Sequence, residues 1–79
     1  MSKMFTEEEK TRLSVGLKQT MKSISNGADK VFVAKDTPYD IIDKINAVYS
    51  GEVVEAESMR ELGRMCGIEV KASCAALKR

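Results

Sequence analysis

The sequence contains no histidine and no tryptophan, and only two cysteines and one proline in 79 residues. Without an imidazole, the chain cannot build histidine-dependent zinc sites, histidine general bases or serine-histidine-aspartate triads. Its charges nearly cancel, since 13 Lys and Arg oppose 12 Asp and Glu for a net charge of +1. Bulk electrostatic attraction therefore cannot dominate the affinity for any partner. No apolar run approaches the roughly 18 residues of a transmembrane helix.

What remains is the composition of a small globular protein, with 43% hydrophobic and 32% charged residues. We expect a single domain over residues 1–79. The first residues lack the basic and apolar regions of a signal peptide, which favours a cytoplasmic location. Cys66 and Cys74 lie in apolar stretches, where buried packing is more common than reactive chemistry. We therefore expect no metal, no cofactor and no membrane partner.

Hydrophobic spacing and cap residues predict helices and strands that alternate along the chain. Helices are expected at about 6–12, 17–26, 38–50 and 58–66. Thr6 and Ser58 each fit a capping box, and Thr37 fits an N-cap ahead of Pro38. Strands are expected at 13–15, 31–34, 53–56 and 73–77, with the second in the centre of the sheet. This order predicts an α/β fold, a three-layer α/β/α sandwich with a small mixed sheet and helices on both faces.

The segment 14–22 is a candidate binding loop, because open α/β sheets hold ligands where strands lead into helix N-termini. Gly16 permits a close approach of the backbone, and Lys18, Gln19 and Lys22 follow in the first helical turns. Lysines at a helix start oppose its dipole, so a phosphate-bearing ligand would explain them. A solvated helix face is the equal alternative. The Gln19 amide can donate and accept on base edges, which favours nucleic acid over a simple anion.

A second candidate is the segment 67–72, in which apolar and charged residues alternate. It is expected to lie close to the loop that leads into the helix at 58–66. Ile68 and Val70 could present an apolar surface to an unstacked base. Ordinary core packing of both side chains is the more common explanation of this spacing.

Four motifs occur in order along the chain: 16–22, 31–36 followed by Pro38, 57–59 followed by Leu62-Gly63, and 66–70. Together they resemble the ribosomal L-seven-Ae/L-thirty-e family, and most of all its small bacterial branch of YbxF-type proteins. The resemblance extends over about residues 13–77, and the run from Leu62 to Val70 is its most specific part.

The resemblance implies a non-enzymatic domain that binds kink-turn RNA, a bent duplex with sheared G·A pairs beside a short bulge. The helix that starts at Gly16 would enter the widened major groove, with Lys18 and Gln19 at the sheared guanines and Lys22 at the backbone. The turn at 68–72 would cover bulged nucleotides, and Asp36 would lie near the groove and orient the lysines. The implied site consists of Gly16, Lys18, Gln19, Lys22, Asp36, Ile68, Glu69, Val70, Lys71 and Ala72.

The partner expected from this resemblance is a structured RNA such as ribosomal RNA or a riboswitch, and DNA is not expected. The protein itself is expected to be a monomer that works on or near the ribosome. Two alternatives stay open. One is a protein-interaction module of the same fold, which would show a large apolar patch on the helix at 38–48. The other is a redox enzyme, which requires a lowered thiol pKa at Cys66 or Cys74.

Overall fold

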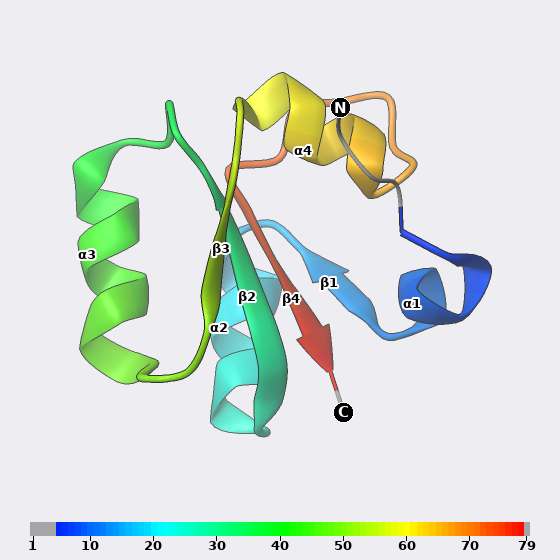
Figure 1. Cartoon of the computed structure of the whole chain (residues 1–79). Helices are drawn as coiled ribbons and strands as arrows, with labels where there is room; N and C mark the ends of the chain where they lie inside the picture. Colours follow the sequence, from blue (N-terminus) through cyan, green and yellow to red (C-terminus); the bar gives the residue numbers. More distant parts are fainter. Residues whose placement is uncertain (1–4, 79) are drawn as a thin grey trace.

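A four-stranded sheet lies between helices in the structure, a computed structural model that describes residues 5–78 (Figure 1). Helices and strands alternate, as the sequence predicts. The elements are α1 (Glu7–Thr11), β1 (Leu13–Val15), α2 (Leu17–Ser25), β2 (Ala28–Ala34), α3 (Tyr39–Val48), β3 (Val53–Ala56), α4 (Met59–Met65) and β4 (Cys74–Lys78).

The strand order of the sheet is β1-β4-β2-β3. β4 pairs antiparallel with β1 and with β2, whereas β2 and β3 are parallel. The predicted mixed sheet and the interior place of β2 are therefore confirmed. β2 begins at Ala28, three residues before the predicted start, because Ala28 pairs with Lys78 at the far end of β4.

Two apolar clusters occupy the two faces of the sheet, as expected for a three-layer sandwich. On one face, Val31, Val33 and Cys74 pack against α2 and α3. On the other face, Phe32 packs against α4 and meets the ring of Phe5 edge-on at a centroid distance of 4.9 Å. The apolar stripe predicted for the second helix is confirmed, since its members pack into the first cluster: Leu17, Met21 and Ile24.

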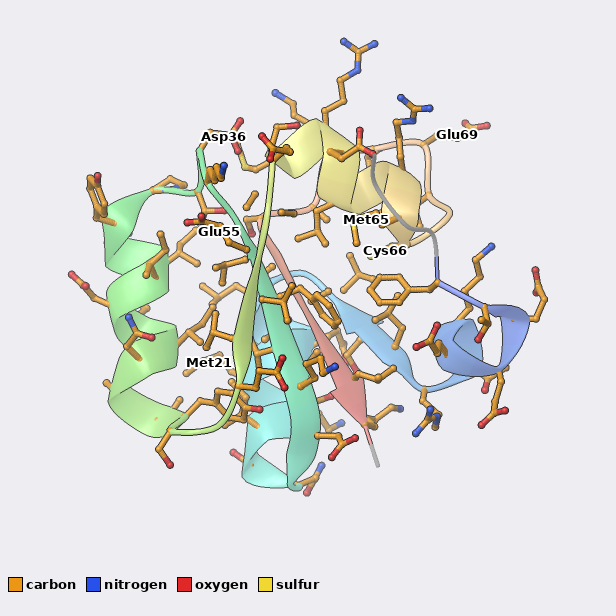
Figure 2. All side chains as sticks on the ribbon, viewed as in Figure 1. Met21, Asp36, Glu55, Met65, Cys66 and Glu69 are labelled. Atoms are coloured by element: carbon orange, nitrogen blue, oxygen red, sulfur yellow. The ribbon has the colours of Figure 1, made fainter. Side chains whose placement is uncertain are left out.

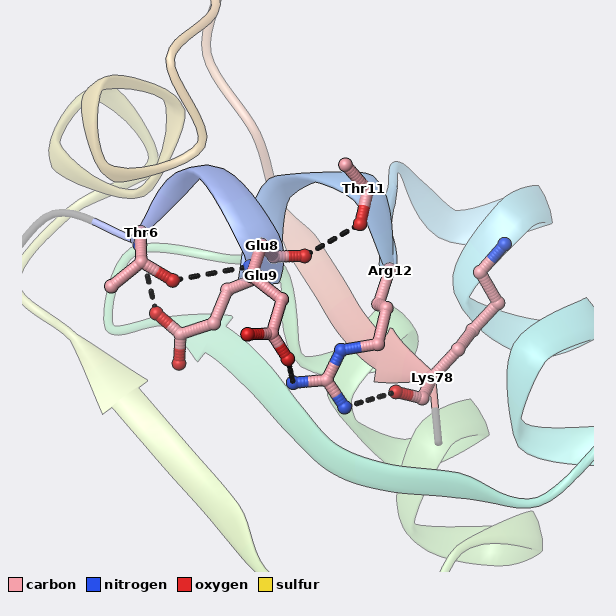
Figure 3. A network of polar contacts seen from close by, with 6 residues as sticks. All are labelled: Thr6, Glu8, Glu9, Thr11, Arg12 and Lys78. Carbon is pink, nitrogen blue, oxygen red and sulfur yellow. Dashed lines mark hydrogen bonds and ion pairs between the residues drawn. The ribbon is translucent and has the colours of Figure 1, made fainter.

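The capping box predicted at the start of α1 is present (Figure 3). The Thr6 hydroxyl accepts a hydrogen bond of 3.1 Å from the Glu9 amide, and the Glu9 carboxylate accepts one of 2.8 Å from the Thr6 amide. At the other end of α1, the Arg12 guanidinium donates to the Lys78 carbonyl at 3.3 Å and pairs with Glu8 at 3.9 Å. These contacts fasten α1 to the end of β4.

Two of the predicted caps differ in the structure. Thr37 does not cap α3; the N-cap position is Pro38, and the buried Thr37 hydroxyl donates to the Ser73 carbonyl at 2.7 Å. The hydroxyl therefore donates to a distant carbonyl instead of accepting from an amide of the first helical turn. Ser58 accepts from the Glu61 amide at 3.0 Å as predicted, but the Glu61 carboxylate pairs with Arg64 at 3.9 Å. Only half of this capping box is therefore seen.

Candidate functional site

Backbone hydrogen bonds bring the predicted binding segments to one end of the sheet (Figure 1). The Gly16 amide donates to the Cys74 carbonyl at 3.0 Å, where β1 leads into α2. The Ala34 amide at the end of β2 donates to the Ser73 carbonyl at 3.2 Å. The start of α2, the end of β2 and the loop 67–73 are thus neighbours.

The start of α2 has a conformation that requires glycine. Gly16 has φ 93° and ψ 158°, a region that essentially only glycine adopts. A side chain built there would meet nothing within 4 Å, so the space in front of Gly16 is open. No side chain caps α2 and no acidic residue lies in its first turn, in contrast to α1. The positive end of the helix dipole is therefore available to an anion.

The three polar side chains predicted for this helix are all exposed. Lys18 and Gln19 lie in the first turn of α2, and Lys22 follows one turn after Lys18. Residues four apart on a helix share a face, so the two lysines can engage the same ligand. The predicted exposure is confirmed.

The loop 67–73 is held across α4 at both of its ends. The Ile68 amide donates to the Gly63 carbonyl at 3.1 Å, and the Ala72 amide donates to the Met59 carbonyl at 3.0 Å. Between these anchors, the Val70 carbonyl lies so close to Gly63 that no Cβ fits there without displacing it. The expectation that this segment lies beside the loop into α4 is confirmed.

The apolar side chains of this loop divide between core and solvent. Ile68 is partly buried against the core cluster, and Ala72 is 2% exposed. Val70 is 68% exposed, so the alternative of ordinary core packing holds for Ile68 and not for Val70. Glu69 and Lys71 are exposed, and Figure 2 shows Glu69 on the outer side of the loop. The loop therefore presents an apolar side chain between two charged ones.

Asp36 has a structural partner in α4. Its Oδ1 atom accepts a hydrogen bond of 2.7 Å from the Met59 amide, and Figure 2 shows the side chain at the turn after β2. The neighbouring Lys35 pairs with Glu57 at 3.4 Å. Among residues 5–78, Asp36 therefore bonds to the start of α4 and forms no ion pair with a lysine. Sequence reasoning missed this contact because its partner is 23 residues away.

A hollow of about 670 Å³ lies between α4 and the loop. Its lining combines residues predicted for the site with two arginines that sequence reasoning missed: Arg60, Arg64, Ile68, Glu69, Val70 and Lys71. The sequence pattern that could have identified Arg60 and Arg64 is their spacing, four residues apart and shortly before the loop 67–73.

The cysteines have no place in this site. Both are buried and free, as predicted, and burial raises the pKa of the Cys66 thiol to about 11. A redox role for Cys66 requires the opposite direction. Within the described part of the chain, no cluster of three or more Cys, Asp or Glu could hold a metal ion, and no helix is long and apolar enough to span a membrane.

Comparison with known proteins places these features in a family. The model of the Ribosomal protein L7Ae/L30e/S12e/Gadd45 family matches residues 2–79. The RNA-binding protein TTE2299 of Caldanaerobacter subterraneus subsp. tengcongensis is 41% identical over 66 residues, which cover 78% of this chain and 80% of that protein. The RNA-binding protein YbxF of Geobacillus stearothermophilus is 35% identical over 72 residues, which cover 86% of this chain and 88% of that protein.

A solved structure has the same fold. The Giardia lamblia 15.5kD RNA binding protein superposes with a TM-score of 0.78 at 23% identity. The match covers 87% of this chain but only 62% of the Giardia protein, so the likeness concerns the shared part of the fold. With a family model that spans nearly all of its residues and two relatives above 30% identity, this chain belongs to the Ribosomal protein L7Ae/L30e/S12e/Gadd45 family.

Proposed function

We propose that this protein binds structured RNA that contains a kink-turn and stabilises its bent form, without catalysing a reaction. The observation that carries the proposal is the hydrogen bond from the Gly16 amide to the Cys74 carbonyl. It joins the uncapped start of α2 to the first residue of β4, directly after the loop 67–73, so one surface offers a helix end and an exposed apolar loop. The names of the relatives, which describe RNA-binding proteins, support the same class of ligand.

The α2 side of this surface would read the duplex. Lys18 and Gln19 would contact the sheared guanines, because a lysine can donate to the acceptors of guanine and an amide can both donate and accept. Lys22, one turn further along α2, would contact a backbone phosphate. Gly16 keeps the helix end free of a side chain, so the RNA backbone can approach it closely.

The loop side would cover unstacked nucleotides of the bulge. Val70 and Lys71 are exposed and would make the contacts, with Glu69 beside them. Ile68 and Ala72 are packed inward and would hold the loop in place. Asp36 would act in the same indirect way, through its hydrogen bond to the Met59 amide.

The protein would act as a monomer that selects the kinked conformer from a mixture with extended RNA. Ribosomal RNA or a riboswitch in the cytoplasm is the partner that we propose. The exposed hydrophobic residues of α3 weigh against a protein-interaction module. Tyr39 and Val48 are 84% and 54% exposed, but they are nine positions apart, about 14 Å along a helix, so they do not form one patch.

The test compares two short RNA duplexes at one salt concentration. One contains a standard kink-turn, and in the other Watson-Crick pairs replace the sheared G·A pairs. We expect at least tenfold tighter binding to the kink-turn, equivalent to about 1.4 kcal/mol. Equal affinity for the two duplexes would reject the proposal, because it would show that the protein does not recognise the kinked geometry.

A further inference from the structure

We propose that the outer edge of β3 binds an extended, basic segment of a partner protein, which adds to the sheet as a further strand. The site lies outside the proposed RNA surface, because it involves neither α2 nor the loop 67–73. β3 is at one end of the strand order β1-β4-β2-β3, and among residues 5–78 its only strand partner is β2 (Figure 1). Its other side is therefore an open edge of the sheet.

Backbone groups of β3 point out of this edge. Val31 of β2 is in register with Val53, and the Val31 amide donates to the Glu52 carbonyl at 3.1 Å. In a parallel ladder the backbone groups of successive residues point alternately toward the neighbouring strand and away from it. The amides and carbonyls of Val53 and Glu55 therefore point away from β2. A segment added along β3 can use them as donors and acceptors.

The neighbouring helix α3 leaves the edge accessible. Ile45 of α3 belongs to the apolar cluster that contains Val31 and Val33 of β2, and no residue of β3 belongs to that cluster. Val53 is 38% exposed, and Glu55 is exposed as well. A partner strand can therefore reach β3 without displacing a helix.

The side chains around β3 favour a basic partner. Residues 45–59 contain three glutamates and no lysine or arginine, and all three glutamates are exposed. Glu57 pairs with Lys35 at 3.4 Å, whereas Glu52 and Glu55 have no ion pair with another of residues 5–78. Two carboxylates beside the open edge are thus available to cations of a partner.

Negative charge extends from β3 to α3. Over residues 40–57, five acidic residues and one lysine give a net charge of −4, in a chain whose total is +1. The phosphates of RNA would be repelled by such a surface. A basic polypeptide would be attracted to it, because complementary charges favour association. The partner at this edge is therefore a protein segment and not RNA.

The same charges disfavour a second copy of this chain as the occupant. Two β3 strands paired edge to edge would bring the glutamates of both copies together, where like charges destabilise a strand pair. Charged side chains on edge strands are a common protection against such self-pairing. Lysine or arginine in the added strand would instead form cross-strand ion pairs with Glu55.

A hollow beside β3 provides a place for an apolar side chain of the added strand. Its volume is about 400 Å³, and its apolar lining consists of Phe5, Phe32, Val54 and Met65. Side chains of neighbouring strands that point to one face of a sheet lie beside each other, so a residue next to Val54 would point to the face of the hollow. Lys30 also lines it and would repel a cation. The expected segment therefore alternates basic and apolar residues.

The experiment uses the whole 79-residue chain and, as the probe, a fluorescent peptide of alternating lysine and valine with blocked ends. Fluorescence anisotropy measures its affinity. In one control peptide, glutamate replaces every lysine. In the other, the backbone amides are methylated, so the side chains and charges are kept but the peptide cannot donate hydrogen bonds to a strand.

Protein variants separate backbone pairing from charge. Val53→Pro removes an amide that points out of the edge, whereas Val53→Ala removes the same side chain and keeps the amide. Glu55→Gln removes a carboxylate at the edge, and Glu69→Gln on the loop 67–73 is its matched control. Far-ultraviolet circular dichroism confirms that every variant is folded. Amide hydrogen exchange of the unaltered protein, with and without the peptide, gives a readout that needs no variant.

We expect the lysine-valine peptide to bind and to protect the Val53 and Glu55 amides from exchange. Val53→Pro should bind it about three- to tenfold more weakly than Val53→Ala, the effect of one lost hydrogen bond. Glu55→Gln should bind it about two- to fivefold more weakly than the unaltered protein, and Glu69→Gln less than about twofold more weakly. The affinity of all four variants for RNA should stay unchanged.

Four results would overturn the proposal. Equal affinity for the methylated peptide, or equal binding by Val53→Pro and Val53→Ala, would show attraction by charge without strand addition. Absence of binding at about 1 mM lysine-valine peptide would show that the edge does not accept a basic segment. Self-association of the protein that Val53→Pro abolishes would assign the edge to a second copy. A loss of RNA affinity in Val53→Pro that Val53→Ala does not share would assign it to the RNA.

Discussion

The Asp36 carboxylate accepts a 2.7 Å hydrogen bond from the Met59 amide, and this bond joins the turn after β2 to the first residue of α4. The Met59 carbonyl in turn accepts a hydrogen bond from the Ala72 amide at the end of the loop 67–73. Asp36 is the residue that the family resemblance assigns to the RNA groove. Through these two bonds, it helps to fix the position of the loop 67–73 on α4.

Asp36→Ala should lower the free energy of unfolding by about 1 to 2 kcal/mol, since it removes the acceptor for an amide at a helix start. Asp36→Asn keeps an oxygen in place and should lose less than half of that. Both effects are measured by urea denaturation. RNA affinity should follow the same order, with Asn restoring most of what Ala loses. Equal loss of RNA affinity in both variants would show that the Asp36 charge itself acts on the RNA.

Lys18→Ala and Gln19→Ala should each weaken binding to a kink-turn RNA by about 1 to 3 kcal/mol if their side chains reach base edges. The salt dependence separates these base contacts from the phosphate contact proposed for Lys22. Lys22→Ala should lower the slope of log affinity against log salt by about 1, whereas Gln19→Ala, which removes no charge, should leave the slope unchanged. Titrations at several salt concentrations measure both quantities. Lys44→Ala and Asn46→Ala on the exposed side of α3 are the controls. If these variants lose as much RNA affinity, Lys18 and Gln19 do not make specific contacts with the RNA.

Gly63→Ala should destabilise the protein by about 1 to 3 kcal/mol, the usual cost of an extra methyl group in a tight contact. Alanine is the better helix former, but its Cβ would meet the Val70 carbonyl, and backbone cannot rotate aside as a side chain can. The loop should shift and RNA affinity should fall with stability. Thermal unfolding and RNA titration of the same sample test this. A variant of unchanged or raised stability would contradict the close approach of the loop to α4.

Cys66 should make stability fall in alkaline solution. Burial raises its pKa from 9.0 to about 11 in the folded protein, so the folded chain keeps the proton where the unfolded chain releases it. The thiol therefore contributes full stability below pH 9, and this contribution is lost as the pH rises through 11, by about 3 kcal/mol at most. Urea denaturation of the unaltered protein and of Cys66→Ala measures the difference. A difference that does not change between pH 8 and pH 11 would contradict the raised pKa.

Thr20→Val should stabilise the protein by about 1 kcal/mol. Thr20 is fully buried, and its hydroxyl has no hydrogen-bond partner among residues 5–78, so replacing it with a methyl group removes an unsatisfied polar atom. Ser23→Ala is the contrasting variant, because the Ser23 hydroxyl donates to Ser14 at 2.6 Å inside the same helix-sheet contact. That change should cost about 1 kcal/mol. Calorimetric melting of both variants should give shifts of opposite sign.

The features that the sequence predicts correctly are local ones. The Thr6 to Glu9 capping box and the end of α2 at Asn26-Gly27 depend on residues within one helical turn. The features that it misses depend on partners far along the chain. Thr37 bonds to Ser73, and Ala28 at the start of β2 pairs with Lys78; no local pattern distinguishes these outcomes from a helix cap and a loop.

The candidate site follows the same division. The exposure of Lys18 and Gln19 follows from helical spacing, and it is seen in the structure. Whether Val70 faces the core or the solvent depends on how the loop crosses α4, which Gly63 and its close contact decide. The position of Arg60 beside that loop is likewise visible only once the two segments are placed together.

The position of β4 between β1 and β2 has a consequence for the order in which a nascent chain can mature. Among residues 5–78, β1 has no other strand partner, and the bonds that align the start of α2 with the end of β2 use the carbonyls of Cys74 and Ser73. Until residues 73–78 are in place, the rest of the chain can form the β2–β3 pair but not this alignment. The arrangement of these segments should therefore form in a single late step of folding, when residues 74–78 add to the sheet as β4.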